Sequence, residues 1–513
     1  MRARILCLVL LAALVAVAPA AAGELPLGPN WLQEARTASE VAPGVTYTRI
    51  ERGLSPPRDV FVVDVDFTAT RSEARELRRR LRDSGYAARV KRVRKRAPDD
   101  PERGPLGYLV RVGAFANEAA AMALRSELVA AGHAAARVVF TGEDGGRTTG
   151  PWVVHALEID PITFGGAIVP ALATDVVPGR EPLSALAART GSLAALNGGY
   201  FVIGAENGTD GDLAGVSVLD GALLSEAVNG RTSLVLPDRT GEAAVIDALS
   251  TRQEVVAGDG ARRELDGLNR APGLIRGCGG SGGDAPTERP KHDFTCTDPS
   301  ELIRFDDVFG PVTEPGPGAE AVLDADGVVT ELREGRGGPI PAGGTVLAGT
   351  AEGADWLRAH AQPGTRIVTE LGVASEQGPL DLGPQAGVVN GGPRLLRGGR
   401  KDITAYAEGF HWPEDPEFFY RFGVRRNPRT LAGVTRDGRL LLVAVDGRRP
   451  GYSVGASFVE SARVLRALGA ADGVNLDGGG STSLTVGSTL VNRPSDATGE
   501  RPIGDALVLR PSP

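Results

Sequence analysis

The stretch Asn475-Leu476-Asp477-Gly478-Gly479-Gly480-Ser481-Thr482-Ser483-Leu484 places a carboxylate before three glycines and a run of hydroxyl side chains. Such a composition is unsuited to a core, because glycine is best placed where the backbone turns sharply or approaches a ligand. Upstream, apolar residues at helical spacing predict a helix over residues 457–469, and Val474 with Leu476 predicts a short strand. Asp477 would therefore stand at the end of a strand, in either a tight turn or a binding site.

Four other stretches combine polar residues with glycine or proline at expected strand ends. They are Asn197-Gly198-Gly199-Tyr200-Phe201, Asn390-Gly391-Gly392-Pro393, Asn427-Pro428-Arg429-Thr430 and Asp446-Gly447-Arg448-Arg449. Each stretch by itself predicts a turn. Their recurrence favours a common site over a set of unrelated turns.

The length of 513 residues exceeds one ordinary domain, so we expect two or three. The chain has 70 glycines and 36 prolines but only 5% aromatic residues, which indicates many turns and short strands. We predict an α+β fold, with one large domain on a long mixed sheet over residues 151–513. An insertion around residues 260–315 would interrupt this domain.

The N-terminus predicts export. Arg2 and Arg4 precede an apolar run over residues 5–17, and small residues up to Ala22 suit a cleavage site, so residues 1–22 are read as a signal peptide. No later segment approaches the ~20 apolar residues of a membrane span, so we expect a secreted protein without an integral membrane segment. Removing the signal peptide would make the net charge of −8 still more negative, which argues against nucleic acid as a partner.

Two cysteines, Cys278 and Cys296, remain after the signal peptide. In an oxidising compartment they most simply form one disulfide, with two free thiols as the alternative. A zinc site is not indicated, because the five histidines are scattered and the two cysteines with His292 lack a fourth ligand.

An internal repeat with a 47-residue offset occupies residues 59–140, after a leader (23–58) in which we expect little independent structure. Each copy reads strand, helix, glycine turn, strand, and a Gly-rich linker (141–150) follows. The matching positions are Val62, Val63, Val65, Ala74, Leu77, Leu81 and Gly85 with Leu109, Val110, Val112, Ala121, Leu124, Leu128 and Gly132. Thr70 with Glu73 predicts a capping box for the first helix, and Asn117 an N-cap for the second. We predict a small two-repeat βαβ domain.

This small domain resembles a SPOR domain, most clearly at Tyr108-Leu109-Val110-Arg111-Val112-Gly113-Ala114-Phe115. The resemblance implies binding to peptidoglycan or another cell-wall glycan. Residues 71–96 hold twelve basic and three acidic residues, which predicts either a solvated helix face or attraction to an anionic wall polymer.

The rest of the chain resembles the phosphodiester glycosidase family over roughly residues 151–510. The resemblance rests on the loops quoted above and on the tail Val491-Asn492-Arg493-Pro494-Ser495-Asp496 with Glu500-Arg501-Pro502. Leu431-Ala432 departs from the pattern, because a small residue is expected directly after Thr430. The resemblance implies hydrolysis of sugar-1-phosphodiesters such as those of N-acetylglucosamine.

Cleavage of such a bond passes through a transition state with oxocarbenium character. A carboxylate can stabilise this transition state directly, or it can activate the attacking water. Asp477 is the best candidate for this carboxylate, with Glu460 or Asp446 as its catalytic partner. Glu460 could instead cap a neighbouring turn, and Asp446 could serve only in its own turn. A serine hydrolase is not indicated, because the loop Asp477-Gly478-Gly479-Gly480-Ser481 is not a nucleophile elbow.

The phosphate requires cationic or amide donors, for which an arginine fork and a glycine-rich loop are suited. The residues expected to contact the substrate are Arg429, Thr430, Arg448, Asn197, Gly198, Asn390, Gly478, Gly479, Gly480 and Ser481. No cofactor is required by the sequence, although Ca²⁺ or Mg²⁺ could bind Asp477 and nearby asparagines.

We therefore predict a secreted hydrolase of sugar phosphodiesters in cell-wall or surface polysaccharide. The alternative is a glycan-binding or exopolysaccharide-assembly protein that uses the same pocket without catalysis.

Overall fold

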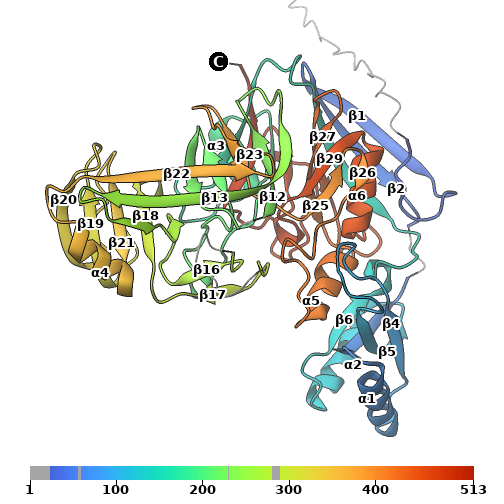
Figure 1. Ribbon diagram of the computed structural model, residues 1–513. Helices are drawn as coiled ribbons and strands as arrows, with labels where there is room; N and C mark the ends of the chain where they lie inside the picture. Colours follow the sequence, from blue (N-terminus) through green and yellow to red (C-terminus); the bar gives the residue numbers. More distant parts are fainter. Residues whose placement is uncertain (1–22, 56–58, 229, 280–288, 513) are drawn as a thin grey trace, which may run out of the picture.

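The computed structural model describes residues 23–55, 59–228, 230–279 and 289–512, so the predicted signal peptide lies outside the described residues. The fold is α+β and rich in strands, as predicted. A large elongated domain carries a small domain that projects below it (Figure 1). Within the described ranges, no helix has the length and apolar character needed to cross a membrane.

The small domain has the predicted repeat. Its elements are β3 (Phe61–Thr68), α1 (Arg71–Asp83), β4 (Ala88–Val93), β5 (Gly107–Phe115), α2 (Glu118–Ala130) and β6 (Arg137–Phe140). The strands form an antiparallel sheet in the order β4-β5-β3-β6. The Thr70 capping box and the Asn117 N-cap are both confirmed.

The first sheet of the large domain has eight strands in the order β1-β2-β7-β28-β27-β29-β25-β26. They span Glu34–Ala42, Val45–Arg52, Trp152–Ile159, Leu440–Val445, Arg429–Thr435, Ala470–Asn475, Arg394–Arg397 and Arg400–Lys401. Alternate residues of β28 enter two different hydrophobic cores, so its continuous apolar run is explained by burial on both faces. The helix α6 (Phe458–Ala467) packs against this sheet.

We predicted little independent structure in the leader, and this prediction is wrong for residues 34–52. They form β1 and β2, and β2 pairs with β7 along eight residues. The chain thus begins the large domain, leaves it to build the small domain, and returns at β7. Weak apolar alternation hid these strands, because β1 is the edge strand of the sheet and few side chains of β1 and β2 are fully buried.

A second set of strands forms the middle of the large domain. One sheet runs β11 (Ala222–Ser225), β10 (Ser217–Leu219), β24 (Gly387–Val389), β12 (Arg231–Leu236), β13 (Val245–Ala257), β22 (Ile367–Ser375), β23 (Gly378–Leu380), with β14 (Arg262–Glu264) paired to β13. Another runs β31 (Thr489–Leu490), β30 (Leu484–Val486), β9 (Ala194–Asn197), β32 (Asp505–Arg510), β8 (Ala167–Leu172). The helices here are α3 (Leu183–Thr190) and α5 (Pro416–Phe419).

The long strands β13 and β22 extend as an arm to an outer unit (Figure 1). This unit is a five-stranded sheet, β15 (Gly267–Leu268), β18 (Leu302–Asp306), β21 (Thr345–Gly349), β19 (Gly316–Leu323), β20 (Val329–Arg336), covered by α4 (Ala351–His360). The excursion is therefore longer than the predicted insertion at 260–315. The prediction of a single long mixed sheet is also wrong, because the large domain contains several sheets. Among the described residues, β15 and β18 form the one parallel pair of strands.

Residues 141–150, expected to be a linker, are packed between the two domains. Gly142, Glu143, Asp144 and Gly145 are all buried. The helix-free face of the small sheet contributes Val93, Leu109 and Phe140 to a core shared with the large domain. The small domain is thus fixed to the large one rather than tethered beside it.

Candidate active site

A cavity of about 690 Å³ lies between the two domains, and we call it the interdomain cavity. The small domain lines it with Phe61, Glu118, Arg137, Val138 and Phe140. The large domain contributes, among others, Tyr200, Phe201, Arg231, His292, Arg429, Arg448, Asp477, Gly478, Gly479 and Gly480. The predicted loops around Asp477, Asn197 and Arg429 therefore converge, whereas the contribution of the small domain was not foreseen.

Asp477 follows β29 and stands partly buried in the cavity wall. The side-chain amide of Asn197 donates to the Asp477 carbonyl (2.8 Å), and the Asp477 N–H donates to the Gly198 carbonyl (3.2 Å). The Thr430 hydroxyl donates to Asn197 Oδ1 (2.7 Å). Asn197, Gly198 and Thr430 therefore hold the Asp477 loop from behind and do not line the cavity.

Asp477 has a second buried carboxyl group near it, Asp505 at the start of β32. Asp505 Oδ1 accepts from the Gly199 N–H (2.9 Å), while Oδ2 is buried and has no hydrogen-bond partner in the described part of the chain. Burial raises the pKa of Asp477 to about 6 and the pKa of Asp505 to about 7. The negative charge of Asp477 also raises the pKa of Asp505. Sequence reasoning missed Asp505, although an acid opening an otherwise apolar strand is a detectable signal.

Two buried arginines face the interdomain cavity. Arg429 donates through Nε to the Ala456 carbonyl (3.0 Å) and lies over the Phe458 ring (4.4 Å), and Arg231 donates through Nε to the Glu408 carbonyl (3.1 Å). Burial lowers the pKa of Arg429 to about 9 and that of Arg231 to about 10.

Neither arginine forms an ion pair within the described ranges, and Arg231 Nη2 is buried without a partner. Because a buried cation without a counter-charge is costly, the cavity favours an anionic ligand at this position. Arg231 was not predicted, since it lies inside an ordinary strand pattern.

The Gly478–Gly480 turn forms one edge of the cavity. Gly479 has a φ of +63°, which favours glycine, and a Cβ at Gly480 would lie 2.2 Å from an Arg501 guanidinium nitrogen. Arg448 approaches this turn, and its guanidinium donates to Asn427 Oδ1 (3.0 Å). Ser481 is fully buried and does not line the cavity, contrary to its predicted contact with substrate.

An aromatic cluster adjoins the two arginines, with Arg429 over the Phe422 ring (5.4 Å) and Arg231 over the Phe410 ring (4.9 Å). The His292 ring lies 4.3 Å from the Tyr200 ring and 4.8 Å from the Phe422 ring, and burial lowers the pKa of His292 well below its usual range. This histidine is therefore neutral at physiological pH. The sequence suggested His292 only as a zinc ligand beside the two cysteines, where a fourth ligand is lacking.

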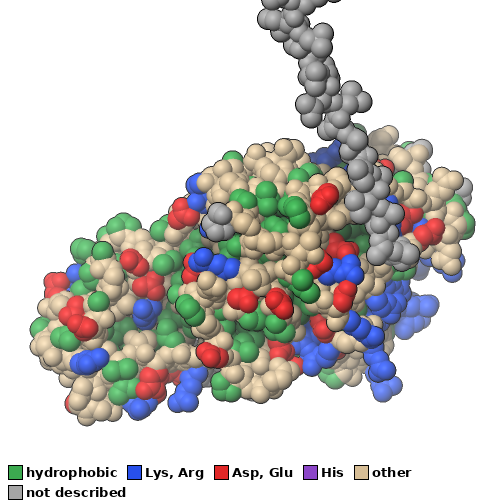
Figure 2. Space-filling view, turned by 90° about the horizontal axis from the view of Figure 1, so that it is seen from above, with side chains coloured by type: hydrophobic (Ala, Val, Ile, Leu, Met, Phe, Trp, Pro, Cys, Tyr) green, Lys and Arg blue, Asp and Glu red, His purple; other side chains and the backbone are tan. Residues whose placement is uncertain are grey.

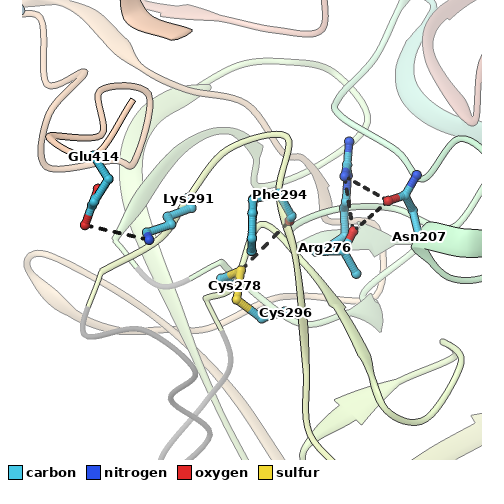
Figure 3. The surroundings of a disulfide bond; sticks show 8 residues. Asn207, Arg276, Cys278, Lys291, Phe294, Cys296 and Glu414 are labelled. Atoms are coloured by element: carbon cyan, nitrogen blue, oxygen red, sulfur yellow. Dashed lines mark hydrogen bonds and ion pairs between the residues drawn. A yellow bond between two sulfur atoms is a disulfide. The ribbon is translucent and has the colours of Figure 1, made fainter. Parts of the chain in front are cut away.

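His292 belongs to the segment closed by the predicted disulfide, Cys278–Cys296, which is confirmed. The two cysteines follow or lie in the paired strands β16 (Leu274–Arg276) and β17 (Thr295–Thr297). Figure 3 shows the disulfide with Arg276 bonded to Asn207 on one side and the Lys291–Glu414 ion pair (3.8 Å) on the other. The cross-link thus secures the part of the chain that presents His292.

Glu460 and Asp446, the proposed catalytic partners, lie outside the cavity wall. Glu460 caps α6 through Ser457 and forms a buried ion pair with Arg426 (2.7 Å). Asp446 is fully buried and accepts from His155 Nε2 (3.1 Å) and the Tyr452 hydroxyl (2.9 Å). Both carboxylates are saturated by structural partners, so neither is available to a substrate.

Asn390, which was expected to contact the substrate, does not line the cavity either. Its Oδ1 accepts from the Tyr200 N–H (2.8 Å), and its side chain packs directly against Gly199. Asn390 therefore positions Tyr200 at the cavity wall. Among the residues that the structure describes, no group of three or more His, Cys, Asp or Glu could hold a metal ion.

Comparisons with known proteins concern the family of the chain and its fold. Residues 317–510 match the phosphodiester glycosidase family, a shorter span than the resemblance predicted from sequence. The N-acetylglucosamine-1-phosphodiester alpha-N-acetylglucosaminidase of Mus musculus is 33% identical over 133 residues, 25% of this chain and 25% of that protein. The Bos taurus enzyme of the same name is 32% identical over 127 residues. The chain spans about a quarter of the length of these curated relatives.

Two solved structures extend the comparison to the whole fold. A hypothetical protein from Synechocystis has a TM-score of 0.54 at 18% identity, covering 93% of this chain and 79% of that one, which supports the fold alone. A candidate exported protein from Burkholderia pseudomallei K96243 has a TM-score of 0.87 and 34% identity, covering 95% of this chain and 98% of that one. The chain therefore carries a phosphodiester glycosidase domain at residues 317–510 and belongs, over nearly its whole length, to the family of the Burkholderia pseudomallei protein.

Proposed function

We propose that the protein is an exported hydrolase that cleaves the bond between an anomeric carbon and a phosphodiester oxygen. One observation carries the proposal: the Asp477 carboxyl group shares a cavity wall with two buried arginines that have no carboxylate partner in the described residues. A sugar phosphodiester carries the two features that such a wall would bind, an anionic phosphate and a centre that becomes cationic in the transition state.

In this mechanism Arg429 and Arg231 bind the phosphate oxygens, and Asp477 lies toward the anomeric carbon. The ionised carboxylate of Asp477 stabilises the developing oxocarbenium character or takes a proton from the attacking water. The C1–O bond breaks, the bonding pair leaves with the phosphate, and the products are a free sugar and a phosphomonoester. Phosphate is a good leaving group, so the reaction needs little acid assistance, which fits the neutral His292.

The glycan partner belongs to the same proposal. The SPOR resemblance of residues 59–140 favours a cell-wall or surface glycan, and N-acetylglucosamine-1-phosphodiesters are suggested by the names of the curated relatives. Because the helix-free face of the small sheet is buried against the large domain, such a glycan would bind an outer face or the interdomain cavity.

The test is release of sugar from an N-acetylglucosamine-1-phosphodiester by wild type and by Asp477→Asn. We expect the substitution to lower kcat at least about a hundredfold. The matched control is Asp437→Asn, which changes an exposed carboxylate in the β27–β28 turn and should leave kcat unchanged. In the wild type, kcat should rise with pH through about 6, because Asp477 must lose its proton.

Sugar release that is unchanged in Asp477→Asn would exclude this residue from catalysis. If no sugar phosphodiester is cleaved but such ligands still bind, the glycan-binding alternative is correct.

A further inference from the structure

The small domain has a second concave surface, a groove of about 540 Å³ between α1 and β4, which we call the arginine groove. It is lined by Arg71, Arg75, Arg78, Arg82, Arg89, Val90, Arg92, Arg94 and Tyr108. The four arginines of α1 follow helical spacing and so project from one face of the helix. The strand β4 supplies Arg89 and Arg92, and Arg94 follows directly after it. Both walls of the groove therefore carry positive charge.

These seven arginines differ from most others in the protein because none forms an ion pair with a carboxylate within the described part of the chain. Two of them donate hydrogen bonds to backbone: Arg82 Nε to the Ala88 carbonyl (3.2 Å) and Arg89 Nη1 to the Gly113 carbonyl (2.8 Å). Arg78 Nε is buried and has no hydrogen-bond partner among the residues that the structure describes. By contrast, Arg111 in the same sheet is paired with both Asp64 and Asp144.

Like charges gathered in this way repel one another, and no carboxylate among the described residues pairs with them. The chain as a whole is acidic, with a formal net charge of −8. Over the large domain, acidic and basic side chains are interspersed on the face shown in Figure 2. The concentration of exposed positive charge in one groove is therefore suited to a ligand of opposite charge.

We infer that the arginine groove binds a linear polymer of sugars or polyols joined by phosphodiester bonds. Guanidinium forks match phosphate oxygens, and Tyr108 offers an aromatic face for the intervening sugar or polyol. The choice of this polymer over other polyanions rests on the proposed function, which acts on the same kind of bond.

The groove and the interdomain cavity belong to one rigid arrangement, since the small domain also lines the cavity with Arg137 and Phe140. A polymer held in the groove would therefore be kept at high local concentration near the catalytic cavity. Short substrates would not depend on the groove.

The experiment measures binding of fluorescently labelled poly(glycerol phosphate) to the full chain by anisotropy at low salt. The variant Arg75→Gln/Arg78→Gln removes two groove charges, and Arg79→Gln/Arg80→Gln removes two charges of the same helix outside the groove. Glutamine has a helix propensity close to that of arginine, so α1 should persist in both. We expect the groove pair to weaken binding about tenfold and the control pair less than about twofold, with affinity falling as salt rises.

Equal losses in the two pairs, or no binding by the wild type, would overturn the inference. Tighter binding of a charge-matched single-stranded DNA would assign the groove to nucleic acid and also overturn it. Hydrolysis of a small sugar phosphodiester is measured on the same variants and should not change. Groove-dependent binding without any hydrolysis would refute the proposed function and support the polymer-binding role of the arginine groove. Hydrolysis without groove-dependent binding would support the proposed function and refute that role.

Discussion

Asp477, Arg429 and Arg231 are charged side chains withdrawn from water into one cavity wall, and burial shifts their pKa values in opposite senses. The pKa of the acid rises to about 6, and the pKa values of the two arginines fall to about 9 and about 10. In each case the charged form loses solvation. A phosphate ligand would stabilise the arginines, so the apo site stores an electrostatic cost that substrate binding relieves.

Asp477→Asn should therefore stabilise the folded protein at neutral pH. An acid whose pKa is raised on folding destabilises the native state once it is ionised, and that penalty grows between pH 3.8 and about 6. We expect the free energy of unfolding to increase by about 1–2 kcal/mol at pH 8 and to be unchanged at pH 3.5, measured by urea denaturation. Equal stability of variant and wild type at pH 8 would contradict the pKa shift.

The helix α6 shows how one carboxylate can look catalytic while serving its element. Ser457 and Glu460 form a capping box that begins the helix, and Arg426 holds Glu460 from a neighbouring loop. Burial opposes ionisation of Glu460, but Arg426 outweighs it and the pKa of Glu460 is lowered. Glu460 therefore remains a charged structural anchor behind the site.

Substitution of Glu460 should change stability and not catalysis. Glu460→Ala leaves Arg426 buried without a counter-charge and should cost about 3–5 kcal/mol of unfolding free energy. Glu460→Gln retains the capping contact and should cost roughly 1–3 kcal/mol. Both are measured by urea denaturation together with kcat per folded molecule, which should stay within about twofold. A hundredfold loss of kcat in a stable Glu460→Gln variant would restore Glu460 as a catalytic residue.

At the scale of the whole molecule, the small domain is a wall of the interdomain cavity. Arg111 of β5 donates to Asp64 (2.5 Å) and Asp144 (2.7 Å), and Tyr420 of the large domain donates to Asp144 (3.1 Å). This buried network, together with the shared apolar core, fixes Phe140 and Arg137 at the cavity. Substrate selection is therefore expected to depend on both domains.

Arg111→Lys should test this dependence. Lysine keeps the charge but cannot form the bidentate contacts, so we expect a loss of about 1–3 kcal/mol in stability and a several-fold rise in KM with little change in kcat. The control is Arg125→Lys on α2, which lies away from the interface and should leave KM unaltered. An unaltered KM in a measurably destabilised Arg111→Lys would show that the small domain does not shape the cavity.

The amino-acid sequence determined what depends on neighbours along the chain. The repeat at residues 59–140, its helix caps and the disulfide were foreseen, because apolar spacing, capping residues and a pair of cysteines are local signals. The exceptional composition of the Asp477 turn was also sufficient to single out that loop. Family resemblance supplied the chemistry expected there.

Only the tertiary structure decided which side chains meet. Asn197 supports Asp477 across 280 residues of sequence, and Arg231 and His292 reach the cavity from segments whose local pattern does not predict that position. The same folding places Glu460 and Asp446 among structural partners, out of reach of substrate. The physical reason is that sheet pairing and burial between distant segments, not local spacing, set the position of a charged group. They also set the free-energy cost of removing that group from water.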